Sequence, residues 1–72
     1  MIRKRSVTIR GHRTSISLED EFWQALQTIA GARGVSLSAL IAEIDENRRP
    51  DDNLSSSMRL CVLEWLRSGK GL

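Results

Sequence analysis

The feature that most constrains the fold is an alternation of apolar and polar side chains over residues 5–18, which changes phase in the middle. Apolar or β-branched residues stand at odd positions before Gly11-His12 and at even positions after it. They are Val7, Ile9, Thr14, Ile16 and Leu18. A period of two is typical of a β-strand with one buried face, and a two-residue turn that begins with glycine suits a type II′ hairpin.

Two structures are compatible with this pattern. One is a hairpin that turns at Gly11-His12, with Ile9 opposite Thr14 and all the apolar residues on one face. The other is a flexible arm followed by a single strand. The alternation alone does not choose between them, because a solvated arm carries no requirement for pairing.

Three helices are predicted after the strand region, over about residues 19–33, 36–47 and 55–67. In each segment apolar residues recur three or four positions apart, which is the spacing of a buried helix face. The fold class is therefore α+β and mostly α. A chain of 72 residues forms one domain, so we assign residues 1–72 to a single unit.

The ends of the helices are indicated by residues that satisfy free backbone groups. Ser17 and Asp20 are predicted to form a capping box at the first helix. Gly34 is predicted to end that helix in the left-handed conformation, and Ser36 to cap the second.

The length of the chain makes a second copy an expected part of the fold. A domain this short buries only about 60 % of the surface that its unfolded chain exposes, and it usually needs a disulfide, a metal or a partner chain. Cys61 is the only cysteine and His12 the only histidine, so neither a disulfide nor a structural zinc site is expected, and no cofactor is indicated. We therefore expect a homodimer.

Basic side chains gather at the start of the chain. Residues 1–13 carry five of them and no acidic one, whereas the rest of the chain has six basic and nine acidic side chains. The five are Arg3, Lys4, Arg5, Arg10 and Arg13. A basic end on a mildly acidic body indicates a polyanionic partner, although a solvated terminus would show the same composition.

Several classes of protein are disfavoured by the sequence. No apolar run approaches the roughly 20 residues that cross a bilayer, and no signal-peptide pattern follows the basic start, so we expect a cytoplasmic protein without a membrane partner. No nucleophile and base stand in a recognisable arrangement, so we expect no enzyme. The acidic residues near the second connector lack the glycine and final glutamate of a calcium loop. They are Asp45, Glu46, Asp51 and Asp52.

Two stretches resemble the ribbon-helix-helix family of bacterial repressors. They are residues 14–22 (Thr-Ser-Ile-Ser-Leu-Glu-Asp-Glu-Phe) and residues 34–41 (Gly-Val-Ser-Leu-Ser-Ala-Leu-Ile). Family members typically show an alternating strand, a leucine just before an acidic helix start, and a Gly-x-Ser turn before the second helix. The whole chain resembles a short bacterial subfamily with an extra C-terminal helix. This resemblance implies an intertwined homodimer with a core motif at 13–46, a basic arm or outer strand at 1–12 and an added helix at 54–67.

The resemblance also implies a function and a site. Family members insert a dimeric antiparallel ribbon into the DNA major groove, so we expect a transcriptional regulator that binds double-stranded DNA. The base-facing residues would be Arg13, Ser15 and Ser17. Contacts to the phosphate backbone would come from Arg3, Lys4, Arg5, Arg10, Ser36 and Ser38. The dimer core would consist of Ile16, Leu18, Phe22, Leu26, Leu40, Ile41 and Ile44.

One alternative function stays open at this point. The hairpin would widen the dimeric ribbon to four strands, which do not fit the major groove as two do. The chain would then serve as an antitoxin-like or adaptor module for protein interaction, without direct contact to DNA bases. A protein partner would dock on the third helix, since the six residues after Leu66 are too few to wrap a toxin.

Overall fold

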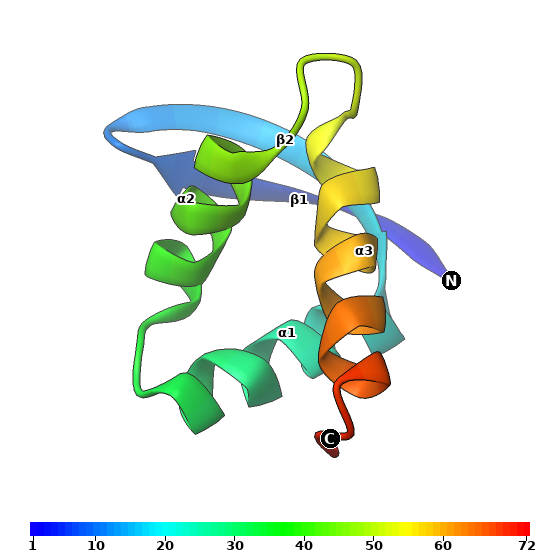
Figure 1. Cartoon of the computed structure of the whole chain (residues 1–72). Coiled ribbons are helices and arrows are strands. Elements are labelled where there is room, and N and C mark those ends of the chain that lie inside the picture. Colours follow the sequence, from blue (N-terminus) through cyan, green and yellow to red (C-terminus); the bar gives the residue numbers. More distant parts are fainter.

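The computed structural model describes residues 1–72 as a two-stranded sheet followed by three helices (Figure 1). The elements are β1 (Ile2–Ile9), β2 (His12–Glu19), α1 (Asp20–Arg33), α2 (Leu37–Asn47) and α3 (Leu54–Arg67). Each helix begins and ends within one residue of its predicted bounds, and the α+β, mostly α fold class is confirmed. The spacing of apolar residues was sufficient to place the helices because each helix buries one continuous face.

The N-terminal segment is a hairpin rather than an arm, but its turn differs from the prediction. Ile9 pairs with His12, so the turn residues are Arg10 and Gly11 instead of Gly11 and His12. Both have positive φ, 50° and 82°, as a type I′ turn requires, and the twist of that turn matches the twist of the strands. Ile9 therefore pairs with His12 and not with the predicted Thr14. Because this shift is two residues, which is one period of a strand, every side chain stays on its predicted face.

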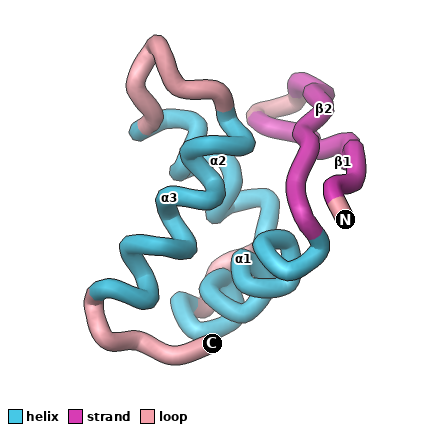
Figure 2. The backbone as a smooth tube through the Cα atoms, turned by 90° about the vertical axis from the view of Figure 1, so that its right-hand side faces the viewer, coloured by secondary structure: helices cyan, strands magenta, loops and turns pink.

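The hairpin has one face against the helices and one open to solvent. Figure 2 shows all three helices on the same side of the two strands. The covered face carries the buried residues Ile9, Ile16 and Leu18, and Val7 is half-buried beside them. One face of the sheet therefore covers the core, and the other face is free to contact another molecule.

The helix ends confirm two of the three predicted caps. Gly34 ends α1 with φ 70°, and the Ser36 hydroxyl accepts a hydrogen bond from the Ala39 amide at 3.0 Å. The capping box of Ser17 and Asp20 is wrong. Ser17 is still in β2, because it pairs with Lys4, and the N-cap is Glu19, which makes no side-chain cap.

The core is completed within one chain by α3. Met58 is fully buried and Val62 nearly so, and both pack on residues from α1, α2 and the sheet. The full set of buried residues is Ile9, Ile16, Leu18, Ala25, Leu26, Ile29, Ala30, Leu40, Ile41, Met58 and Val62. The third helix thus provides apolar surface that we had expected a second copy to provide.

The residues predicted for a dimer core are already covered by their own chain. Five are buried and two, Phe22 and Ile44, are half-buried. The buried five are Ile16, Leu18, Leu26, Leu40 and Ile41. Their place at a dimer interface stays a prediction.

Length and hydropathy set a limit on membrane crossing. No single helix is long and apolar enough to span a bilayer. Only α1 and α2 taken together have the length and apolar composition of a membrane span, and the two helices are bent by 101° at the break between them.

Replacing Met58 by alanine tests the role of α3 in the core. We expect the free energy of unfolding to fall by about 2–5 kcal/mol, because the substitution leaves a cavity at a fully buried site. Urea denaturation followed by circular dichroism measures the change. Leu72→Ala, at an exposed position beyond α3, is the control and should cost clearly less. Equal losses for the two variants would contradict the packing described here.

Candidate nucleic-acid interface

The solvent-facing side of the hairpin forms a polar strip made from both strands. Lys4 pairs with Ser17, Ser6 with Ser15, and Thr8 with Arg13, and all six are exposed. The three predicted base-facing residues, Arg13, Ser15 and Ser17, therefore lie on one face. Ser6 and Thr8 were not predicted as site residues, and the alternation of β1 was the signal that placed them there. We call these six residues the outer strip.

The outer strip is positively charged. Lys4 and Arg13 make no ion pair, and the Arg13 guanidinium donates a hydrogen bond to the Ser6 hydroxyl at 3.3 Å. Glu19 is the next residue of β2 on this face after Ser17, and its carboxylate is paired with Arg59 at 2.8 Å. The two cations of the outer strip are therefore available to an external anion.

Two other basic residues of β1 lie on the covered face. Arg3 and Arg5 both contact the carboxylate of Asp20, at 3.3 and 2.7 Å. The Arg5 guanidinium also stacks over the Trp23 ring, 4.5 Å from its centre. Arg5 therefore acts as a structural cation that attaches β1 to the start of α1, and it is not a free phosphate contact.

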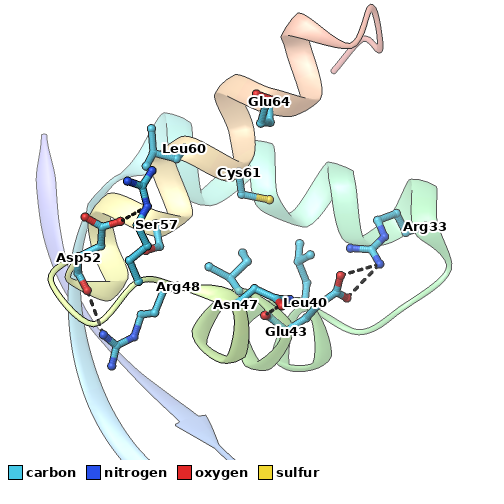
Figure 3. A pocket seen from close by; sticks show the side chains of 12 residues that line it. Arg33, Leu40, Glu43, Asn47, Arg48, Asp52, Ser57, Leu60, Cys61 and Glu64 are labelled. Carbon is cyan, nitrogen blue, oxygen red and sulfur yellow. Dashed lines mark hydrogen bonds and ion pairs between the residues drawn. The ribbon is translucent and has the colours of Figure 1, made fainter.

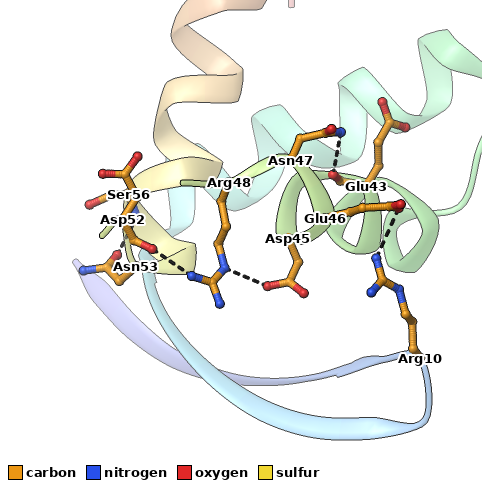
Figure 4. A network of polar contacts seen from close by, with 9 residues as sticks. All are labelled: Arg10, Glu43, Asp45, Glu46, Asn47, Arg48, Asp52, Asn53 and Ser56. Carbon is orange, nitrogen blue, oxygen red and sulfur yellow. Dashed lines mark hydrogen bonds and ion pairs between the residues drawn. The ribbon is translucent and has the colours of Figure 1, made fainter. Parts of the chain in front are cut away.

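Arg10 is also paired within the chain. Its guanidinium lies 3.1 Å from the Glu46 carboxylate at the end of α2, and Figure 4 shows it beside a second pair, Arg48 with Asp45. Three of the four basic residues predicted to contact phosphates thus have a carboxylate partner, and Lys4 is the exception. Sequence reasoning missed this because the acids come from distant positions and meet the hairpin only in the folded chain.

The predicted phosphate site at the start of α2 lies apart from the outer strip. The Ser36 hydroxyl is used as a cap, and the amides of Leu37 and Ser38 are among the first-turn donors that a helix leaves free. In Figure 1, α2 runs toward the sheet from the end of α1. Its last turn, at Glu46, contacts the hairpin. In a single chain the structure does not bring Ser36 and Ser38 to the predicted base-facing residues.

The edge of β2 that does not pair with β1 is largely open. The sheet has two strands only, and the Ser17 amide points outward, donating to the Ser55 hydroxyl at 3.2 Å. Arg13 and Ser15 share that direction, because backbone groups alternate along a strand. Their outward groups make no hydrogen bond within the chain. Such an edge is able to pair with a strand of another chain.

An ion pair fixes α3 beside the end of β2. Arg59 donates to the Glu19 carboxylate at 2.9 Å from its Nε atom, and its guanidinium lies over Phe22. The backbone hydrogen bond to Glu19 and the bond from Arg59 hold the pKa of this carboxyl below its ordinary value. The contact joins the sheet, α1 and α3 at one corner.

A cleft of about 350 Å³ opens between α2 and α3, with Cys61 in its wall (Figure 3). Burial raises the pKa of the Cys61 thiol, so this cysteine is a neutral apolar group at physiological pH. Arg33 in the same cleft is held by both oxygens of Glu43, at 3.1 and 2.9 Å. The charge of Arg33 is thus balanced within the cleft.

These features define a β-ribbon protein, with an exposed polar ribbon face on a helical core. The family model described as the ribbon-helix-helix domain matches residues 2–66. The chain therefore belongs to the ribbon-helix-helix family, as its motifs indicated. That fold is a non-enzymatic regulator fold whose members typically dimerise and bind DNA. Neither a curated protein nor a solved structure gives a match to the chain.

Neighbouring basic residues of β1 are expected to have opposite roles. Arg5→Ala should lower the free energy of unfolding by about 1 kcal/mol, because it removes a partly buried ion pair and a cation–π contact. Lys4→Ala, which removes a cation without a carboxylate partner, is the control and should leave stability unchanged. Thermal denaturation of the two variants makes the comparison. An equal effect at both positions would contradict the assignment of the two faces.

Stability is expected to depend on pH through Glu19. Its pKa is lower in the folded chain than in the unfolded one, so the ionised carboxylate contributes stability that is fully present above the unfolded value. That contribution is lost as the pH falls below about 4.5 and through the folded pKa. Glu19→Gln should flatten the acid limb of a plot of stability against pH, measured by urea denaturation. Glu21→Gln, two residues further along the chain at an exposed site, is the control and should leave the acid limb unchanged.

Proposed function

We propose that this protein binds double-stranded DNA as a homodimer through the outer strip and acts as a transcriptional regulator in the cytoplasm. The observation that carries the proposal is that Lys4 and Arg13 stand exposed on one polar face without a carboxylate partner. Membership of a family that typically binds DNA supports the same conclusion.

The open edge of β2 suits the pairing of two copies. Two β2 strands in antiparallel pairing would place Arg13 and Ser15 of both copies side by side at the centre of the sheet. Arginine donates two hydrogen bonds to the major-groove edge of guanine, whereas serine contacts bases with little preference. In this proposal Arg13 supplies most of the sequence preference, and Ser15 and Ser17 add close contacts.

The β1 strands determine how such a sheet meets the groove. Four strands at a spacing of about 4.8 Å span roughly 14 Å between the outer backbones, and the major groove is about 12 Å wide. The central β2 strands would therefore enter the groove while the β1 strands lie along its rims, turned aside by the twist of the sheet. Lys4 would then lie beside the phosphates.

The other predicted backbone contacts have smaller roles in this proposal. Arg3, Arg5 and Arg10 would have to exchange a carboxylate for a phosphate, so they contribute mainly to stability. Ser36 and Ser38 lie away from the outer strip in one chain, and we expect them to add less than Lys4.

The alternative function is a protein-interaction module without base contacts. The observation that favours it is the apolar surface of α3, where Leu60, Leu63 and Leu66 are each nearly half exposed. A module of this kind would leave the outer strip without a ligand. DNA binding is preferred because it accounts for the outer strip.

Fluorescence anisotropy of a labelled duplex, titrated at several salt concentrations, tests the proposal. The logarithm of the binding constant should fall with the logarithm of salt concentration with a slope of several units, at about 0.9 per phosphate contact. Lys4→Ala should weaken all duplexes alike and reduce the slope by about 2, because the dimer carries two copies of Lys4. Arg13→Ala should relax the preference for a selected duplex by about 1–3 kcal/mol in each half-site.

The control is Arg33→Ala, which removes a cation at the end of α1 that is paired with Glu43 and does not belong to the outer strip. It should bind the duplex like the parent protein. Absence of binding at low salt would overturn the proposal in favour of the protein-interaction module. An unchanged sequence preference in Arg13→Ala would show that Arg13 does not contact bases.

A further inference from the structure

The outward side of α3 carries an apolar ridge. Leu60, Leu63 and Leu66 are exposed by 48, 47 and 46 %, and they follow one another at intervals of three residues, a spacing that places side chains in one row on a helix. Three adjacent half-exposed leucines in a chain of this size are more than scattered surface residues, and contiguous apolar surface marks an interaction site.

A groove runs beside the ridge, between α1 and α3. It has a volume of about 640 Å³, and its apolar lining comes from Phe22, Val62 and the ridge leucines themselves. Arg59, whose guanidinium lies over Phe22 and is paired with Glu19, forms part of its wall. The face therefore offers both a projecting row of leucines and a hollow that is able to receive one.

We infer that a second copy of this chain docks on this face, with the two α3 helices antiparallel and Leu63 on the two-fold axis. In a two-fold interface the same patch meets itself, so it has to be self-complementary. A ridge beside a groove meets that requirement, because each copy inserts its leucines next to the groove of the other. A row centred on Leu63, with Leu60 and Leu66 equally exposed on either side, is symmetric about the axis.

Charges at the two ends of α3 favour the antiparallel arrangement. Asp51 and Asp52 precede the helix; Asp52 lines the groove and is paired with Arg49 at 3.7 Å, whereas Asp51 makes no ion pair. Arg67 and Lys70 lie at the other end, where Lys70 stacks on the Trp65 ring and Arg67 makes no ion pair within the chain. Antiparallel docking brings Arg67 of one copy near Asp51 of the other, and it also opposes the two helix dipoles favourably.

This interface is separate from the open edge of β2. The start of α3 contacts the end of β2 through Ser55 and Arg59, but the rest of the helix lies along the flank of the molecule opposite the strands (Figure 2). Both interfaces are therefore compatible in one assembly, which would be a pair of β2-joined dimers held together through α3. The inference does not depend on DNA binding.

Charge replacement at the axis tests the inference. Leu63→Glu and Leu63→Lys should each halve the mass of the parent assembly in sedimentation equilibrium, since each places two like charges face to face. An equimolar mixture of the two variants should recover the parent mass, because opposite charges then meet across the axis. Circular dichroism verifies the fold, and Gln27→Glu, an added charge at an exposed position of α1, is the control that should keep the parent mass.

A variant of the β2 edge separates this interface from the proposed ribbon dimer. Ser15→Pro removes an outward amide without disturbing the bonds to β1. If both interfaces exist, either Ser15→Pro or Leu63→Glu halves the mass of a tetramer and their combination gives a monomer. If only the α3 interface exists, Leu63→Glu alone converts a dimer to a monomer. A mass unchanged by Leu63→Glu, or a mixture that fails to recover the parent mass, would overturn the inference.

Discussion

The packing of α3 under the hairpin is the contact on which the rest of the structure depends. A hairpin and two helices of this length leave the inner sheet face and the inner sides of α1 and α2 exposed together. Met58 and Val62 cover that surface from a helix late in the chain. Because the core closes within one chain, both faces that remain open, the outer strip and the leucine ridge, are available to other molecules.

The packing of the helices on one face of the hairpin also divides the basic residues of the N-terminal segment into paired and unpaired cations. Strand alternation sends Arg3 and Arg5 toward the helices, where they share the single carboxylate of Asp20, and it sends Lys4 and Arg13 to the solvent. The turn residue Arg10 reaches Glu46 on α2. A segment that is uniformly basic in sequence is thereby divided into cations that stabilise the fold and cations that are free for a ligand. This division is the physical basis for preferring Lys4 and Arg13 as contact residues.

The open edge of β2 and the ridge of α3 are two kinds of unsatisfied surface. The edge offers unpaired backbone groups at Arg13 and Ser15, which a strand satisfies by hydrogen bonds. The ridge offers apolar area, which another apolar face satisfies by exclusion of water. Because the two demands differ in chemistry and lie on different flanks, a single partner does not meet both. The β2 edge and the leucine ridge would therefore bind separate partners, and a second copy of the chain is suited to either surface.

The sequence by itself determined the three helices, the strand before them and the side chains that share a strand face. Periods of two and of three to four residues, with Gly34 and Ser36 at the helix ends, predicted these elements because such signals act between near neighbours in the chain, whereas β1 was only one of two alternatives for the residues before Gly11. The tertiary structure decided which hairpin register forms, why Ser17 is no cap and which arginines are free. Asp20, Glu46 and Ser55 take part in those decisions, and they stand 15 to 38 positions away from their partners in the chain. The hairpin register depends in addition on a turn geometry that composition does not fix. Contacts of that kind exist only after α3 and α2 have packed on the sheet, so no local pattern was able to predict them.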